Sequence, residues 1–420
     1  MKLIPNVFFR GALLSTGSAI LVGVFGYLTR RTLANNLPEN DYAFFYSMFA
    51  LINFSLIFIQ FGTAEVLLFE VPRWLEAGAK RCASTGYKFI KKFQSINSVV
   101  CILLFLVCFP FLKKYYFSYP VSPINFVLFV LLFWGFSLEN TTLFALNTFK
   151  RFGLISGLRL IKSGLFFAAA CLSLLGGQLS WIIFLIVLAT TFCTLAGDFA
   201  VRQMGMIPTT CHTPVKLKKK IVHSGLIFML LACGNNIAHD VGTITLGFVS
   251  TAQEVVLFNI ALPIAMIIQS MMIILNVFTP MIAESWAKGE KRQLKRLFNR
   301  LFLFTVAAMI IAVPVIVFGG DLLITLLFSK KFIGAKWSTL FLVEAALLSV
   351  PIRALLSFFN TIDKKNISLK TLFPTAGAVI LLFPVLSRVY GATGAGLAAF
   401  LSTVVWLSAY LFYYRRLINE

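Results

Sequence analysis

Charged residues are scarce in this sequence, and acidic residues are the scarcest. Only 12% of the 420 residues are charged, whereas a soluble domain carries about 25%. Asp and Glu number 15 against 37 Lys and Arg, while apolar types make up 59% and Phe alone contributes 45 residues. So little charge cannot cover a water-facing surface of this size, which excludes an ordinary cytosolic enzyme and a disordered chain. The composition predicts an all-α polytopic membrane protein.

Several chemical signatures are missing as well. The seven cysteines form no C-x-x-C pair and no cluster with His, so we expect neither a disulfide framework nor a metal site. The sequence contains no Walker motif, no nucleophile–base pair and no loop long enough for a catalytic domain. We therefore expect no catalytic residues, no cofactor beyond a coupling ion, and no enzymatic activity.

Long apolar runs are what the sequence does contain. A membrane-spanning helix needs about 20 mostly apolar residues, and twelve stretches meet or approach this length. They run over 11–29, 43–69, 94–112, 124–148, 155–175, 180–201, 223–247, 255–279, 298–319, 337–359, 371–388 and 392–414.

The basic residues indicate the orientation of these stretches. The two termini and the alternate loops between them hold 28 of the Lys and Arg residues, and the other loops hold 8. Because cytoplasmic loops carry the excess of Lys and Arg, both termini are predicted to be cytoplasmic. This distribution also explains the net charge of +22 without nucleic acid as a partner.

The two halves of the chain resemble each other. Asn147-Thr148 ends the fourth stretch and Asn360-Thr361 ends the tenth, 213 residues later, and Gly176 matches Gly391 at an offset of 215. Each half has six stretches, so the repeats are expected to be parallel, with substrate bound between them. We predict an N-terminal six-helix bundle over 1–205, a basic cytoplasmic linker over 206–222 and a C-terminal six-helix bundle over 223–420.

Two segments resemble bacterial oligosaccharide flippases. Residues 37–45, L-P-E-N-D-Y-A-F-F, are similar to the L-G-P-E-D-Y-G-x-F segment of that family, and residues 390–398, Y-G-A-T-G-A-G-L-A, are similar to the Y-G-x-x-G-A-A-L-A that opens its last helix. The family transports O-antigen and exopolysaccharide precursors. It belongs to the multidrug/oligosaccharidyl-lipid/polysaccharide exporter superfamily, which also holds lipid II flippases and multidrug antiporters.

The resemblance implies a function in polysaccharide and lipopolysaccharide biosynthesis. A member of this family flips an undecaprenyl-pyrophosphate-linked oligosaccharide across the inner (cytoplasmic) membrane by alternating access, coupled to H⁺ or Na⁺. Its partners would be that lipid-linked oligosaccharide, the membrane lipids, and a glycan polymerase and glycosyltransferases. The alternatives are a small-molecule or drug antiporter of the same superfamily and an integral-membrane glycan polymerase or ligase. The short outer loops argue against the polymerase or ligase.

Charged residues within the apolar stretches are candidates for substrate binding, because an ionisable group at bilayer depth is costly. Arg353 lies in the tenth stretch, and its repeat partner is Asn140, beside Glu139. Arg353 either binds a phosphate, for which its planar fork is suited, or forms a fixed salt bridge with Glu139. Arg159 and Lys162 share one helix face and either face the cavity or reach the cytoplasmic surface.

A polar helix face in the seventh stretch is the candidate for ion coupling. Asn236, His239, Asp240 and Thr243 recur at i, i+3, i+4 and i+7 and so lie on one face. This face either lines a cavity and couples an ion or holds neighbouring helices together by hydrogen bonds. Outside these sets, Asp198 and Arg202 are spaced as a surface ion pair at a helix end.

Overall fold

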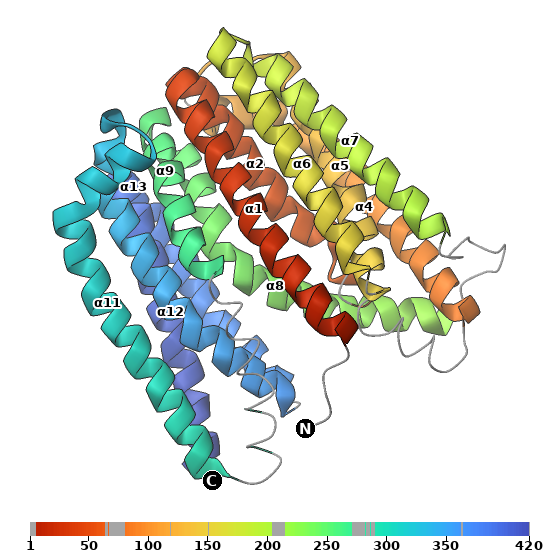
Figure 1. Ribbon diagram of the computed structural model, residues 1–420, viewed down its shortest axis with the longest axis vertical. Helices are drawn as coiled ribbons and strands as arrows, with labels where there is room; N and C mark the ends of the chain where they lie inside the picture. The colour runs from red at the N-terminus through yellow and green to blue at the C-terminus, as the bar shows by residue number, and fades with distance from the viewer. Residues whose placement is uncertain are drawn as a thin grey trace. The chain divides into compact units, whose positions relative to one another are not determined.

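The computed structural model shows a helical fold without strands in the part of the chain that it describes (Figure 1). The described residues are 6–63, 66, 80–117, 119–149, 151–203, 215–270, 282, 286, 290–362 and 364–419. In lipid, a backbone must satisfy its own hydrogen bonds, and a helix does so within one segment. The α-helices are α1 (Asn6–Asn36), α2 (Glu39–Gln60), α4 (Lys80–Tyr115), α5 (Pro123–Thr148), α6 (Phe152–Cys171), α7 (Leu179–Gln203), α8 (Val215–Val249), α9 (Ala252–Ser270), α11 (Lys291–Leu327), α12 (Lys336–Thr361) and α13 (Lys365–Asn419).

Each of the twelve apolar stretches overlaps one of these helices, which confirms the predicted fold class. By length and hydropathy, eight helical segments of the described chain qualify as membrane spans. The stretches at 371–388 and 392–414 both lie within α13, which is two helices joined at a kink. Residues 215–222 of the predicted linker form the first turns of α8.

The chain divides into two compact units. Unit 1 comprises Met1–Asp41 and Leu51–Cys233, and unit 2 comprises Tyr42–Ala50 and Gly234–Glu420. The division therefore falls inside α8, and a short part of α2 groups with the second half of the chain. The domain boundaries expected from the sequence stay a prediction.

The internal repeat appears in the helix boundaries. Helices α5 and α12 each have 26 residues and begin 213 residues apart. Helices α2 and α9 also begin 213 residues apart, as do α6 and α13. Gly176 (φ 71°) and Gly391 (φ 55°) both have positive φ, which glycine adopts without steric cost. Equivalent breaks thus separate the last two helices of each repeat.

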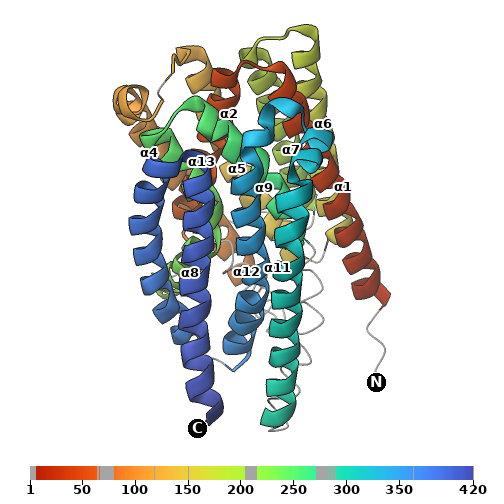
Figure 2. The same cartoon turned by 90° about the vertical axis from the view of Figure 1, so that its left-hand side faces the viewer.

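A carboxylate stabilises the second of these breaks. The backbone of α13 breaks at Gly391, and Figure 2 shows the two limbs of this helix. The backbone N–H of Ala392, which opens the second limb, donates a hydrogen bond of 2.6 Å to Glu254 Oε2 on α9. An acidic group at a helix N-terminus is favourable because it meets the positive end of the helix dipole.

Each unit has its own buried core. In unit 1, Tyr87, Leu146 and Ile155 belong to a cluster shared by α4, α5, α6 and α7. In unit 2, the core is richer in aromatic residues, and Phe298 and Phe358 pack 5.9 Å apart between α11 and α12.

Candidate functional site

The seam between α5 and α6 brings together four of the residues expected to bind substrate. The two helices are joined by a short turn in which the Arg151 N–H donates to the Leu146 carbonyl at 3.1 Å. Glu139 and Asn140 lie on α5, and Arg159 and Lys162 lie on α6. The turn reverses the chain, so residues at similar distances from it face each other across the seam.

Lys162 neutralises Glu139. The Lys162 ammonium lies 2.8 Å from Oε1 and 2.9 Å from Oε2 of Glu139, whose side chain is 5% exposed. The same ammonium is 5.1 Å from the ring centre of Phe136 and 5.8 Å from that of Phe166, within the range of a cation–π interaction. Lys162 is therefore committed to a partly buried pair with Glu139.

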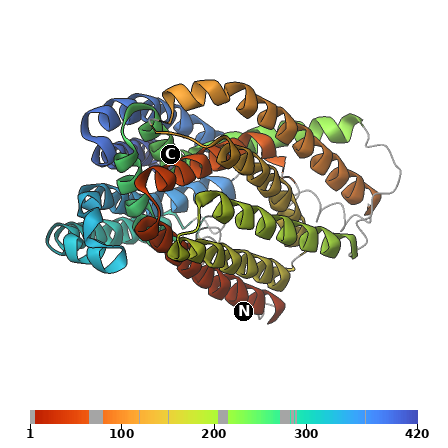
Figure 3. The same ribbon diagram turned by 90° about the horizontal axis from the view of Figure 1, so that it is seen from above.

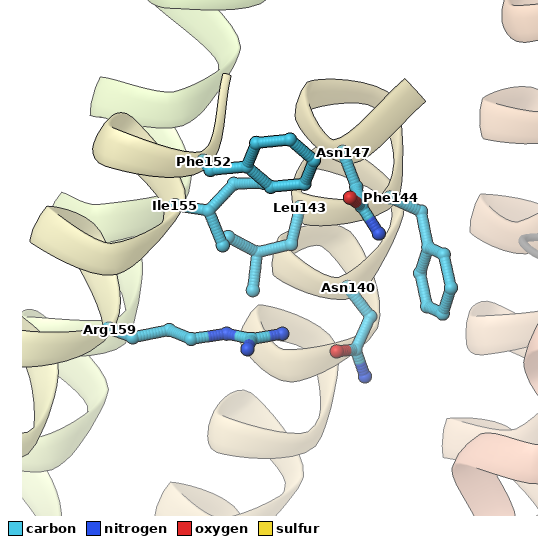
Figure 4. Close-up of a pocket in the computed structure, with 7 residues that line it drawn as sticks. All are labelled: Asn140, Leu143, Phe144, Asn147, Phe152, Ile155 and Arg159. Carbon is cyan, nitrogen blue, oxygen red and sulfur yellow. The ribbon is translucent and has the colours of Figure 1, made fainter. Parts of the chain in front are cut away.

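Arg159 instead extends toward Asn140 along one side of a small cavity (Figure 4). The cavity measures about 130 Å³, and Asn147, two turns from Asn140 on α5, supplies a second amide. Leu143, Phe144, Phe152 and Ile155 complete its lining.

The charge balance of the seam is positive. The salt bridges of the described chain include Lys91–Asp198, Lys162–Glu139 and Lys336–Asp321, and no carboxylate of the described chain pairs with Arg159. Since Glu139 is already neutralised, the guanidinium supplies an uncompensated charge beside two amides. A planar guanidinium and amide donors are suited to hold the oxygens of a phosphate or carboxylate.

The second unit carries its arginine on the other helix of the equivalent seam. At the common offset of 213 residues, Arg353 on α12 corresponds to Asn140, and Leu372 on α13 corresponds to Arg159. The side chain of Arg353 is exposed, whereas its neighbours Ile352 and Ala354 are buried. Arg353 thus lies on α12, whereas Arg159 of the first unit lies on α6. The role of Arg353 in substrate binding stays a prediction.

The buried ion pair of the first unit has no counterpart in the second. Ile352, 1% exposed, occupies the position equivalent to Glu139. Thr375, which donates to the Thr371 carbonyl at 2.8 Å, occupies the position equivalent to Lys162. The two seams thus differ in charge although α5 and α12 match in length and the helices follow in the same order.

The polar face of α8 is described only in part. Thr243 is buried, and the Asn259 amide on α9 donates to its hydroxyl at 3.2 Å, so this end of the face holds two helices together. Asp240 is half-buried and makes a polar or electrostatic interaction of its own. The side chains of Asn236 and His239 lie outside the described part of the structure. The role of this face in ion coupling stays a prediction.

One expected ion pair was wrong. Asp198 bonds Lys91 of α4 at 2.5 Å and accepts a hydrogen bond from the Thr142 hydroxyl at 2.7 Å, instead of pairing with Arg202 on its own helix. A tertiary contact prevails because α4 and α7 both pack against α5. Among the side chains that the structure describes, no group of three or more His, Cys, Asp and Glu is placed to hold a metal ion.

Comparisons with solved structures place this fold among membrane transporters. The lipid II flippase MurJ, in an inward closed conformation, matches with a TM-score of 0.75 and 13% identity over 96% of this chain and 87% of that one. An inward-facing multidrug resistance MATE transporter of the MOP superfamily matches with a TM-score of 0.71 and 12% identity over 97% of this chain and 98% of that one. A mutant of the Vibrio cholerae MATE transporter VcmN matches with a TM-score of 0.66 and 14% identity over 99% of this chain and 97% of that one. The chain thus has the fold of these transporters.

Sequence comparison adds one distant relative. An uncharacterized membrane protein of Methanocaldococcus jannaschii is 20% identical over 93% of this chain and 80% of its own length. No known family profile matches the sequence. The fold and this relative support a multi-pass membrane protein.

Proposed function

We propose that this protein is a transporter that flips an undecaprenyl-pyrophosphate-linked oligosaccharide across the inner membrane by alternating access. The observation that carries the proposal is Arg159, which extends along a cavity with two amides while the adjacent carboxylate is neutralised by Lys162. A positive site of this kind favours an anionic substrate over a cationic drug. The likeness to MurJ, described as a lipid II flippase, supports a lipid-linked substrate.

The size of the cavity indicates which part of the substrate it holds. Pockets for drug-sized ligands measure about 300–1,000 Å³, whereas this one measures about 130 Å³. That space accommodates a phosphate group but not an oligosaccharide. We infer that Arg159 and Asn140 hold one phosphate of the pyrophosphate. Arg353 of the second unit is a further candidate for binding an anion.

Moving a pyrophosphate through the membrane requires replacing its hydration. A fixed guanidinium and preoriented amides compensate part of that desolvation cost. The Lys162–Glu139 pair contributes indirectly, because it removes a negative charge that would otherwise repel the phosphate. Glycosyltransferases would supply such a substrate on the cytoplasmic side, and a glycan polymerase would consume it on the other.

Ion coupling is proposed for Asp240. A partly buried carboxylate within a polar helix face can take up H⁺ or Na⁺, and alternating access would carry the ion across. Binding of the ion would favour one of the two conformations of alternating access over the other.

A drug antiporter is the second candidate, and the MATE likeness at a TM-score of 0.71 favours it. Two transport assays on the purified protein in proteoliposomes distinguish the flippase from the antiporter. One assay follows a fluorescent polyprenyl-pyrophosphate-linked oligosaccharide, and the other follows an organic cation dye under an imposed H⁺ or Na⁺ gradient. We expect translocation of the first and none of the second. Gradient-driven cation transport without lipid translocation would replace the flippase proposal with the antiporter.

A further inference from the structure

A second cavity in unit 1 is lined by the beginning of α4 and the end of α7. The Lys91–Asp198 salt bridge joins these two helix ends, and Figure 3 shows both helices from above. The cavity measures about 330 Å³. Its basic residues are Lys88, Lys91 and Lys92 from α4 and Arg202 from α7. The proposed transport function uses none of these residues.

The cavity keeps an excess of positive charge after its internal ion pair is counted. Asp198 is the acidic residue in its lining, and Lys91 and Thr142 both bond this carboxylate. Lys88, Lys92 and Arg202 are exposed and belong to none of the salt bridges within the described chain. Three side chains, Lys88, Lys92 and Arg202, therefore leave an unpaired positive charge in the lining of the cavity.

The cavity also lies at the depth of lipid headgroups. Helix α4 has 36 residues and is therefore about 54 Å long, against a hydrocarbon core of about 30 Å. Its apolar stretch begins near residue 94, just past Lys92. The basic first turns therefore extend beyond the hydrocarbon core into the interfacial region.

Apolar helix faces continue from the cavity toward the membrane interior. Beyond Lys92, Ile96 and Leu103 of α4 are more than half exposed, and so are Leu195 and Phe199 of α7. A basic cavity followed by exposed apolar faces matches an amphiphile with an anionic head and hydrocarbon tails. Free phosphate would make no use of these faces.

We propose that this cavity binds the headgroup of an anionic phospholipid. Lys88, Lys92 and Arg202 hold the phosphate, and the acyl chains lie along the exposed apolar faces of α4 and α7. Basic residues near a membrane surface attract anionic lipids electrostatically. Zwitterionic lipid lacks the net charge that these three cations attract.

Native mass spectrometry of the delipidated full-length protein tests this site with defined lipids. Phosphatidylglycerol and phosphatidylcholine of the same acyl composition are added to wild type and to the double variant Lys88→Gln/Lys92→Gln. The matched control is Lys113→Gln/Lys114→Gln, which removes two exposed lysines from the other end of α4. Because all four lysines are exposed, both variants should fold.

We expect wild type and control to retain one phosphatidylglycerol with equal affinity, and Lys88→Gln/Lys92→Gln to bind it about tenfold more weakly. Phosphatidylcholine should bind weakly to all three, and millimolar inorganic phosphate should not displace the lipid. Wild-type affinity in Lys88→Gln/Lys92→Gln, or equal binding of both lipids, would overturn the proposal. Displacement by inorganic phosphate would assign the cavity to a soluble anion.

Discussion

Lys162 and Glu139 form an ion pair across the α5–α6 seam, with the ammonium at nearly equal distances from both carboxylate oxygens. Arg159 lies one turn earlier on α6 and has no carboxylate partner in the described chain. Two basic residues three positions apart therefore have different roles. One completes a structural pair, and the other remains available to an anion.

The pair should be energetically coupled. Removing one partner of a partly buried pair leaves the other charge uncompensated, so Glu139→Ala and Lys162→Ala should each destabilise the protein by about 1–3 kcal/mol. The double variant should lose less than the sum of the two. Thermal unfolding of the three variants in detergent measures this coupling. Additive losses would mean that the two side chains do not interact.

Glu254 should stabilise unit 2 through the N–H of Ala392. Removing a capping group at a helix N-terminus costs about 0.5–2 kcal/mol, so Glu254→Ala should lower the melting temperature, and Glu254→Gln should lower it less. Glu290→Ala is a matched control, because Glu290 precedes α11 but forms no side-chain capping bond. If Glu254→Ala and Glu290→Ala lowered the melting temperature equally, Glu254 would have no capping role.

The sequence predicts the helical membrane fold, because the length of an apolar run depends on local composition alone. The orientation inferred from the distribution of Lys and Arg stays a prediction. Spacing also identified Arg159, Asn140 and Glu139 as candidates. It could not identify Lys162 as the partner of Glu139, since that contact depends on how α5 packs against α6. The partner of Asp198 was missed for the same reason.

One residue of the cavity was recognised only as a marker of the repeat. Asn147 lies seven positions after Asn140, a spacing that places both on one helix face, and this signal was already present in the sequence. The internal repeat could not predict which side chains surround Arg353, because that depends on tertiary packing.

Arg353 should be needed for transport although it lies in the second unit. Because it occupies the position equivalent to Asn140, we expect Arg353→Ala to reduce surface glycan export at least tenfold at normal protein levels. Arg353→Lys should restore only part of it, since an ammonium lacks the planar fork. Full export by Arg353→Ala would remove this residue from the mechanism.

Asp240 should determine the dependence of transport on an ion gradient. Asp240→Asn keeps hydrogen-bonding capacity and removes the titratable charge, so the variant should fold and bind substrate. Flipping by the variant in proteoliposomes should no longer respond to an imposed H⁺ or Na⁺ gradient. Thr243→Val is a useful comparison, because it breaks the bond to Asn259 without changing charge. If Asp240→Asn keeps the wild-type response, Asp240 is structural.

The most direct test of the account measures translocation of the labelled polyprenyl-pyrophosphate-linked oligosaccharide by Arg159→Ala. Arg151→Ala is the control, since it removes an exposed guanidinium from the beginning of the same helix, outside the cavity. We predict that Arg159→Ala folds like wild type and loses at least tenfold in translocation rate, whereas Arg151→Ala keeps the wild-type rate. Wild-type translocation by Arg159→Ala would contradict the account.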